Sequence, residues 1–400
     1  MKIGIVSDFH IGYERFYDDA YTQAREAIIG ASERSDMLVI PGDIFDKRYP
    51  KPDVLAQAIN LFRDIKNRNW TAKVTGYKPY GNTKIYTDIP VIAIPGTHER
   101  TAEGKENPLT LLSLAGLLVD CSESTVTVSK GNEHVSVFAI GGLSEELVKP
   151  RLNALNPKPI LGSFNIFMFH QSTYELLPFS DHFIHNDELP KGFDLYINGH
   201  IHNKVIDKIH GNDFLIPGST VLTQLKSGEQ EDKGFFIYDT ITRTFEFFKI
   251  NSRPFIASEI TIHNATPQSF KELIEKKINS QMAFANSKKP IIKIIIFGTI
   301  GNGFSKLDMP IRSIEEQYKD SIYLDFDVKN FVDPKIDKQI SDIQEGKIMG
   351  NSIKEYGFAL FSEKLKKLGF NADINISELF NALIISKKEK AVKEAIEILI

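Results

Sequence analysis

The sequence predicts a layered α/β domain, then a small α+β domain and a C-terminal helical segment. Three observations lead to this expectation. Residues 1–252 alternate short apolar runs with helical patterns, which is typical of sheets covered by helices. The rhythm then changes over residues 253–335, where fewer and longer apolar runs flank two helical patterns. Residues 336–351 are polar and predict a linker, and residues 352–400 carry a helical apolar stripe.

The strands expected in the first domain are rich in valine, isoleucine and phenylalanine and end near glycine or proline. Helices are expected near residues 18–32 and over residues 53–66, and the apolar residues of the second segment recur at helical spacing. The expected strands are KIGIVSD, DMLVIPGD, IPVIAIPG, HVSVFAIGG, FNIFMFH, LYINGH, DFLIPGS and GFFIYDT.

The second domain and the C-terminal segment have simpler patterns. EITIHN, PIIKIIIFGTI and SIYLDFDV predict strands, and PQSFKELIEKKI and IRSIEEQYK predict helices between them. Beyond the linker, Ser352 and Glu355 have the spacing of a capping box. Exposed amphipathic helices commonly bind partners. The stripe that we expect to bind a partner consists of Ile353, Tyr356, Leu360, Leu365 and Leu368.

The composition limits the classes of function. The chain has 400 residues, a net charge of −4 and one cysteine, Cys121. A single cysteine excludes an intrachain disulfide and a cysteine-rich zinc site. No apolar run approaches the roughly 18 residues of a membrane span, and the N-terminus opens as a strand without a signal peptide. These features predict a cytoplasmic protein whose contacts with nucleic acid are local.

Polar side chains that bind metals follow the ends of five expected strands. Asp8 and His10 stand two residues apart, as do His200 and His202, so each pair lies on one face of an extended segment. Ligands collect beyond the carboxyl ends of strands in α/β sheets. The residues expected to meet there are Asp8, His10, Asp43, His98, His170, His200 and His202.

This set of side chains indicates a particular chemistry. Carboxylates and imidazoles without thiolate suit octahedral Mn²⁺ or Fe²⁺ better than a closed zinc site, and Mg²⁺ is a further alternative. Six or seven ligands are too many for one ion that must also bind substrate. Two ions about 3.5–4 Å apart that share a carboxylate would use all of them and would clamp a phosphoester during in-line displacement. The residues therefore predict a two-metal phosphoesterase.

The same residues carry a resemblance to a known family. The motifs D8-x-H10, G42-D43, G96-T97-H98-E99, H170 and G199-H200-I201-H202 resemble those of the calcineurin-like metallophosphoesterases. From GDIFDKRYPKP onward the chain is similar to the SbcD and meiotic-recombination-eleven nucleases of double-strand-break repair. The resemblance implies a layered metallophosphoesterase β-sandwich flanked by helices, a capping domain that binds DNA, and a manganese-dependent DNA exonuclease and endonuclease.

The resemblance also implies roles for individual residues. One Mn²⁺ would be held by Asp8, His10, Asp43 and His202. Asp43 would bridge to a second Mn²⁺ held by Thr97, His170 and His200. His98 would be the catalytic acid that steadies the leaving oxygen.

Two positions depart from the family pattern. Thr97 replaces the asparagine whose carbonyl oxygen binds metal, and Asp46 stands where archaeal relatives often have histidine. Both changes bear on the metal affinity and on the balance between exonuclease and endonuclease action.

Several features predict binding to DNA and to protein partners. The loop with Lys47, Arg48 and Lys51 follows Asp43 closely, and residues 66–84 contain five basic residues, Lys73 and Lys78 among them, but no acidic one. Aromatic residues stand between these cations, as phosphate and base contacts require. By resemblance, the helices near residues 53–65 and 108–118 would form a homodimer, and the C-terminal segment would bind a coiled-coil, SMC-like ABC-type ATPase. The protein would then be associated with the nucleoid.

Two other functions fit parts of the sequence. The same fold serves small-substrate metallophosphatases and cyclic-nucleotide phosphodiesterases, although the second domain and the C-terminal helices are unnecessary for a small phosphoester. A DNA-end-binding scaffold with weakened catalysis would follow if Thr97 abolished the second metal site. The retained His98 and the other ligands disfavour that alternative.

Overall fold

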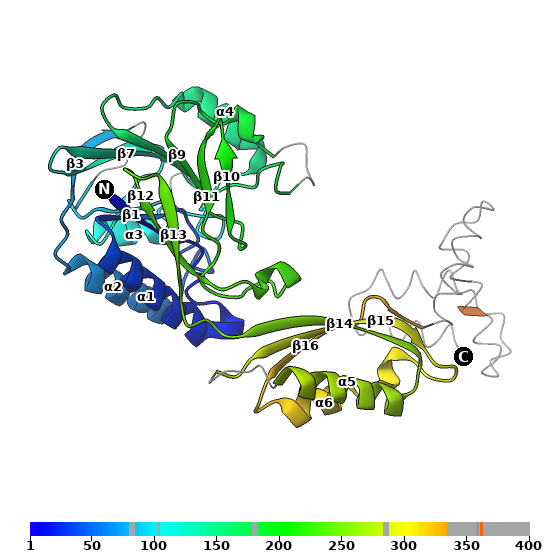
Figure 1. The fold of residues 1–400 in the computed structure, drawn as a ribbon. Helices are drawn as coiled ribbons and strands as arrows, with labels where there is room; N and C mark the ends of the chain where they lie inside the picture. The colour runs from blue at the N-terminus through cyan, green and yellow to red at the C-terminus, as the bar shows by residue number, and fades with distance from the viewer. Residues whose placement is uncertain are drawn as a thin grey trace, which may run out of the picture. The chain divides into compact units, whose positions relative to one another are not determined.

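The computed structural model describes residues 1–79, 85–101, 105–177, 183–282 and 288–333, with residues 358, 361 and 362 (Figure 1). Two compact units are present. The first comprises residues 1–257, 284–293 and 321–323, and the second comprises residues 258–283, 294–320 and the chain from 324 onward. The linker and the stripe of Ile353, Tyr356, Leu360, Leu365 and Leu368 lie outside the described residues. The domain limits at residues 252, 335 and 351 therefore stay predictions.

The first unit contains a six-stranded and a seven-stranded sheet. Neighbouring strands β1, β2, β4 and β5 of the six-stranded sheet are parallel, and β12 pairs antiparallel with both β1 and β13. Its order is β13 (Thr244–Lys249), β12 (Gly234–Asp239), β1 (Lys2–Ile5), β2 (Met37–Ile40), β4 (Val91–Ala93) and β5 (Val119–Asp120).

The seven-stranded sheet has a parallel centre and antiparallel flanks. In the centre, β7 pairs in parallel with β8, β8 with β9, and β9 with β11. The order is β10 (Val205–Ile209), β11 (Asn212–Ile216), β9 (Leu195–Asn198), β8 (Phe164–Phe169), β7 (Glu133–Ile140), β6 (Ser124–Lys130) and β3 (Lys73–Pro79).

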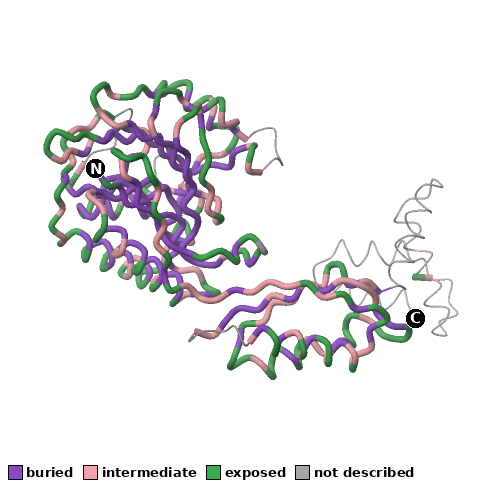
Figure 2. The backbone as a smooth tube through the Cα atoms, viewed as in Figure 1, coloured by how far each residue is buried: buried purple, intermediate pink, exposed green. Residues whose placement is uncertain are grey.

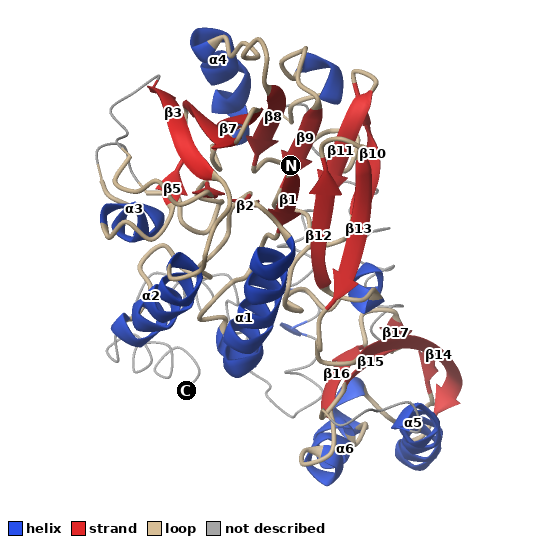
Figure 3. Cartoon of the chain, turned by 60° about the vertical axis from the view of Figure 1, so that its left-hand side comes forward, coloured by secondary structure: helices blue, strands red, loops and turns tan. Residues whose placement is uncertain are grey.

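Side chains that alternate along the strands build three layers of core. Met37 and Val39 of β2 pack in the cluster shared by the two sheets, whereas Leu38 and Ile40 face the helices. Helices α1 (Tyr17–Arg34), α2 (Pro52–Lys66) and α3 (Pro108–Leu114) cover the six-stranded sheet, and α4 (Glu145–Leu155) covers the other (Figure 3). Figure 2 shows the buried strands between these layers. The predicted α/β sandwich flanked by helices is confirmed.

The second unit follows the predicted alternation of strands and helices. Strands β14, β15 and β16 lie in that order in one sheet, and β17 pairs in parallel with β15. Ile274, Ile278 and Ile314 of the helices are fully buried, as are Ile294 and Ile296 of β15. The elements are β14 (Phe255–Ala265), α5 (Pro267–Met282), β15 (Ile291–Ile300), α6 (Ile311–Tyr318), β16 (Tyr323–Asp327) and β17 (Phe331–Val332).

The sequence prediction omitted several outer elements. Strands β3, β5, β6, β10 and β13 alternate polar with apolar residues or are very short, so none forms a continuous apolar run. Helix α4 contains Pro150, which obscures the helical pattern. Short 3₁₀ turns are η1 (Glu14–Phe16), η2 (Asn186–Glu188), η3 (Ser227–Gln230) and η4 (Lys306–Asp308).

Among the described helices, none is both long enough and apolar enough to cross a membrane.

Candidate metal centre

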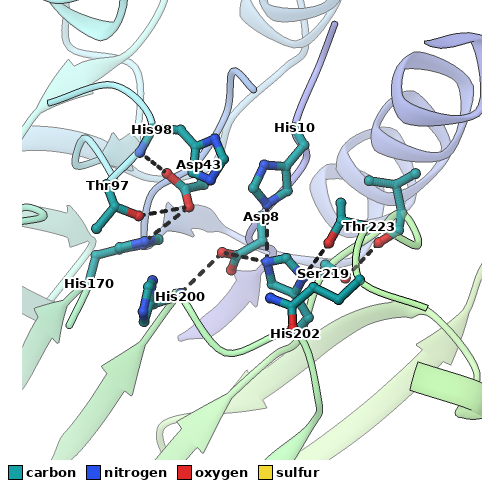
Figure 4. A network of polar contacts seen from close by, with 12 residues as sticks. Asp8, His10, Asp43, Thr97, His98, His170, His200, His202, Ser219 and Thr223 are labelled. Carbon is teal, nitrogen blue, oxygen red and sulfur yellow. Dashed lines mark hydrogen bonds and ion pairs between the residues drawn. The ribbon is translucent and has the colours of Figure 1, made fainter. Parts of the chain in front are cut away.

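The loops that follow β1 and β2 run side by side and continue the pairing of these strands. The backbone N–H of Asp8 donates to the Gly42 carbonyl at 3.2 Å, and that of His10 donates to the Asp43 carbonyl at 3.0 Å. Asp8, His10 and Asp43 are thereby delivered to one edge of the sandwich, where Figure 4 shows them facing His170, His200 and His202.

The backbone at four of these residues is in the left-handed region. The φ angles are +53° at Asp8, +47° at His10, +49° at Asp43 and +72° at His200. Residues with a Cβ adopt this region at a cost, and such positions concentrate at functional sites. The surrounding fold therefore imposes the direction of these side chains.

Glycines make room for the packed loops. A Cβ atom at Gly96 would lie 2.1 Å from Oδ1 of Asp43, and one at Gly42 would lie 2.4 Å from Nδ1 of His170. Gly42 also has a φ of +101°, which only glycine adopts freely. The glycines of the motifs thus let the backbone pass directly behind the functional side chains.

The first cluster consists of Asp8, His10 and His202, whose candidate ligand atoms lie within 4.8 Å of one another. Nε2 of His10 lies 3.1 Å from Nε2 of His202, which in turn lies 3.9 Å from Oδ1 of Asp8. The His200 N–H donates to Oδ1 of Asp8 at 3.1 Å. Both imidazoles thus direct a nitrogen at the same point.

The second cluster consists of Asp43, His170 and His200, again within 4.8 Å. Nδ1 of His170 donates to the Pro41 carbonyl at 2.6 Å, so its Nε2 lies toward Oδ2 of Asp43, 3.2 Å away. Nε2 of His200 contacts the Ser172 hydroxyl at 3.0 Å. The Nδ1 atom of His200 is therefore the nitrogen left for a ligand.

These atoms fit divalent cations. Oδ2 of Asp8 is buried and makes no hydrogen bond in the described structure, although an unsatisfied buried polar atom is costly. Adjacent ligands of an octahedral ion with bonds near 2.1 Å are about 3 Å apart. One pair of atoms in each cluster has this separation: 3.1 Å between Nε2 of His10 and of His202, and 3.2 Å between His170 and Asp43. A bound cation would satisfy Oδ2 of Asp8.

The charges of the second cluster are strongly coupled. Burial alone would raise the pKa of Asp43, but the attraction of His170 outweighs burial and lowers it. Burial likewise opposes protonation of His170, yet Asp43 raises the pKa of that ring to about 9. Burial and His170 together lower the pKa of His200 to about 3. His200 is therefore neutral, as a metal ligand must be.

Burial also governs the carboxylate of the first cluster. It raises the pKa of Asp8 to about 6, despite the opposing attraction of His170. Without a cation, Asp8 is thus less stably ionised than Asp43.

Comparison with known proteins places this centre in a family. Residues 1–204, just over half of the chain, match the calcineurin-like phosphoesterases. The chain belongs to this family. All six residues of the two clusters lie within the matched segment.

Individual relatives of this phosphoesterase are DNA-repair proteins. The double-strand break repair protein MRE11 of Encephalitozoon cuniculi is 27% identical over 316 residues, which cover 73% of this chain and 54% of that protein. The DNA double-strand break repair proteins Mre11 of Saccharolobus solfataricus and Sulfolobus acidocaldarius are 25% and 26% identical, covering 73% and 75% of this chain and 74% and 76% of theirs. The resemblance to the meiotic-recombination-eleven nucleases is confirmed, although the chain spans only about half the length of the first of these relatives.

A third group of the phosphoesterase centre contains His10, Asp46 and His98. Nδ1 of His98 donates to the Asp46 carbonyl at 2.7 Å, and Oδ1 of Asp46 lies 3.6 Å from Nδ1 of His10. The His98 N–H donates to Asp43 at 2.9 Å, while its side chain is 44% exposed. Sequence reasoning treated Asp46 only as a departure and missed its position between these histidines.

Thr97 lies beside the shared carboxylate. Its hydroxyl donates to Oδ2 of Asp43 at 3.4 Å. Thr97 thus contacts a proposed ligand, and its role as a ligand stays a prediction.

Glu99 is a buried support that sequence reasoning did not assign. Its two carboxylate oxygens accept the N–H groups of Phe45 at 2.8 Å and of Gly96 at 2.7 Å. Burial raises the pKa of Glu99 to about 8. The side chain joins the loop of Asp43 to the loop of Thr97 and His98, and its place directly after Thr97-His98 is the only signal in the sequence.

The basic residues expected to bind DNA lie outside both clusters and are exposed. Lys47 pairs with Glu14 at 2.5 Å, and Lys73 pairs with Asp88 at 3.1 Å. Arg48 and Lys51 belong to the loop that follows Asp46, and Lys78 belongs to β3. Tyr80 and Lys84 of the predicted basic stretch lie outside the described residues.

Proposed function

We propose that this phosphoesterase is a manganese-dependent DNA nuclease with exonuclease and endonuclease activity that processes DNA double-strand breaks. The supporting observation is the pair of adjoining Asp/His clusters. Asp43, a member of the second cluster, also accepts the backbone N–H of His98. The names of the relatives point to breaks in DNA as the substrate.

Two Mn²⁺ ions fit the centre. Asp8, His10, Asp43 and His202 would hold the first, and Asp43, Thr97, His170 and His200 would hold the second. When bound, a pair of divalent ions polarises the phosphodiester and lowers the pKa of water. The protein orients these ligands through the Pro41 carbonyl, the Ser172 hydroxyl and the left-handed backbone.

His98 acts as the acid for the leaving oxygen. Its Nδ1 is held by the Asp46 carbonyl, so the Nε2 side of its partly exposed ring can meet substrate. A positioned acid contributes roughly 10²- to 10⁴-fold in rate.

Exposed cations bind the DNA backbone. The loop after Asp46 contains Lys47, Arg48 and Lys51. A second basic segment, β3, contains Lys73 and Lys78. Because an exposed ion pair contributes little to stability, a phosphate can replace Glu14 or Asp88 as the partner of a lysine.

Helices α2 and α3 form the homodimer contact. Ile59 of α2 and Leu111 and Leu114 of α3 are 43%, 49% and 47% exposed, whereas Ala58 and Leu112 of the same helices pack in the core. Exposed apolar side chains on neighbouring helices favour association. Leu111→Glu with Leu114→Glu should give a monomer in sedimentation experiments without loss of folding.

The segment 352–400 binds a coiled-coil, SMC-like ABC-type ATPase, and the complex acts on DNA in the cytoplasm, at the nucleoid. A chain truncated after Asp333 should keep manganese-dependent cleavage of short DNA, since all proposed ligands precede residue 203, but should lose binding in a pull-down with the ATPase. Undiminished binding would assign the partner site to the first two domains.

The deciding experiment is an activity series with the purified full chain and Mn²⁺. The substrates are linear duplex, hairpin and single-stranded DNA, together with p-nitrophenyl phosphodiesters and cyclic nucleotides. Cleavage of DNA that Asp43→Asn abolishes supports the proposal. Cleavage of the small phosphoesters alone would assign a small-substrate phosphodiesterase, and binding of DNA ends without any cleavage would assign a scaffold.

A further inference from the structure

A buried ion pair lies next to His202, outside the segment that matches the family. Glu229 is 3% exposed and Lys233 is 5% exposed, and their charged atoms are 3.7 Å apart. Burying two charges carries a large desolvation cost, and neutral residues often replace such a pair without loss of stability. The pair therefore calls for a role beyond folding.

Lys233 holds the backbone around His202. Its ammonium donates to the His202 carbonyl at 3.1 Å and to the Ser219 hydroxyl at 3.0 Å. The Ser219 N–H also donates to the His202 carbonyl, at 3.2 Å. Two segments that are 17 residues apart in sequence, at Ser219 and His202, are thus joined by one buried cation.

Glu229 holds the loop that contacts the His202 ring. Its carboxylate accepts the Gln224 N–H at 2.9 Å and lies 3.6 Å from Nδ1 of His202. The hydroxyl of Thr223, the residue before Gln224, lies 2.6 Å from the same Nδ1 atom. Figure 4 shows Ser219 and Thr223 beside His202, on the side away from Asp8 and His10.

These contacts fix the ring at both ends. The backbone of His202 is held by Lys233, Nδ1 faces the Thr223 hydroxyl and the Glu229 carboxylate, and Nε2 points at Asp8 and His10. Groups that engage the second nitrogen of a metal-binding histidine set its tautomer and orientation, and their loss typically lowers metal affinity about 10- to 100-fold.

We infer that Glu229 and Lys233 are positioning residues for the cation site of Asp8, His10 and His202, and act on this site selectively. The inference rests on the metal site of the proposed function. In the second cluster, the rings of His170 and His200 contact uncharged groups instead, namely the Pro41 carbonyl and the Ser172 hydroxyl. An ion pair that served folding alone would change the stability of the chain but not the manganese affinity of the folded first site.

The test uses the double variant Glu229→Gln/Lys233→Met, which removes both buried charges and leaves neither unpaired. Manganese binding to the full chain is measured by calorimetry in two backgrounds. His170→Ala removes a ligand of the second site and leaves the first, and His202→Ala does the reverse. The double variant should weaken binding about 10- to 100-fold in the His170→Ala background and less than about twofold in the His202→Ala background.

The matched control is Lys249→Met with Asp232→Asn, which removes an exposed ion pair of 2.6 Å from the same part of the chain. It should leave manganese binding unchanged in both backgrounds. Equal weakening in the two backgrounds, or unchanged binding in the His170→Ala background, would overturn the inference and leave the proposed function intact. Absence of manganese binding to the unaltered chain would overturn the metal proposal itself.

Discussion

The two Asp/His clusters use the same residue types but are held in place by different means. His202 of the first cluster is surrounded by Thr223, Glu229 and Lys233. The rings of His170 and His200 in the second cluster contact the Pro41 carbonyl and the Ser172 hydroxyl. The family match covers residues 1–204, so it includes the supports of the second cluster and leaves out those of the first. A motif therefore locates both sets of ligands but explains the orientation of only one.

The clusters also differ in their ionisation when no cation is bound. Asp43 and His170 form an internal ion pair, because each raises the population of the charged form of the other. Asp8 has only His10 and His202 close by in its cluster, and burial raises its pKa. A cation in the second cluster must displace the proton of His170. A cation in the first cluster mainly offsets the unfavourable burial of the ionised Asp8 carboxylate.

The largest effect is expected from Asp43→Asn, which tests whether the clusters share a ligand. If Asp43 contacts both ions, its loss removes several kcal/mol of transition-state stabilisation, roughly a thousandfold or more in rate, with every metal. The measurement is the nuclease rate together with the number of Mn²⁺ ions bound.

Asp8→Asn is the control for this prediction, since Asp8 belongs to the first cluster alone. It should weaken one binding step and leave the other. If Asp43→Asn also changed one step only, Asp43 would not be a bridging ligand.

A smaller effect is expected from His98→Ala, which tests whether chemistry and metal binding are separate. His98 contacts Asp43 through its backbone N–H, and alanine keeps that donor. The variant should therefore bind two ions normally but cleave about 10²- to 10⁴-fold more slowly. His134→Ala, on an exposed ring that bonds Ser129, should cleave normally. Metal loss from His98→Ala would make this residue a ligand instead.

Much of the fold and most of the site were predictable from the sequence, because both depend on short-range patterns. Continuous apolar runs identified the buried parallel strands, and the residues that follow their ends include all six members of the two clusters. Parallel strands end at one edge, so these residues could be expected to meet. The expectation that each i, i+2 pair lies on one face of an extended segment was wrong, because the backbone is left-handed at Asp8, His10 and His200, and His200 and His202 belong to different clusters.

The supports of the site were not predictable, because they come from distant parts of the chain with no periodic signal. Glu229 and Lys233 stand in the polar stretch KSGEQEDK, which is typical of a solvated loop. Lys233 is buried against His202 and Ser219, which are distant in the sequence, and Glu229 accepts the Gln224 N–H. Asp46 and Glu99 were visible next to motif residues, but their partners were set by loops that only the fold brings together.

The pH dependence of stability should distinguish the clusters further. The pKa of His170 is about 9 in the fold and 6.5 ordinarily. The stability that its proton provides is therefore fully present below pH 6.5 and is lost as the pH rises through 9. Glu99, with its pKa raised from 4.5 to about 8, acts in the same direction. The melting temperature of the metal-free protein should fall by several degrees between pH 6.5 and pH 9.

Manganese should change this dependence, because the ion and the proton compete for His170. Its stabilising effect, measured as the difference in melting temperature with and without Mn²⁺, should be larger at pH 9 than at pH 6.5. A His170→Gln variant should show a smaller decline without metal. A melting temperature that rises with pH in the metal-free protein would contradict the charge pairing described for the second cluster.

The smallest effect is expected from Thr97→Asn, which tests whether the second site is the weaker one. The Thr97 hydroxyl donates to Oδ2 of Asp43, so it orients the shared carboxylate. A hydroxyl is a weaker donor to Mn²⁺ than an amide carbonyl, and its side chain is shorter. Nuclease activity should therefore rise over two ranges of manganese concentration, of which the upper reports the site of His170 and His200. Asparagine at position 97 should shift the upper range to lower manganese concentrations without changing the lower range. Calorimetry and the nuclease rate both measure this shift. Identical titrations of the two proteins would mean that position 97 does not set the affinity of the second site, and the difference between the clusters would then rest on the supports of His202 and on the Asp43–His170 pair alone.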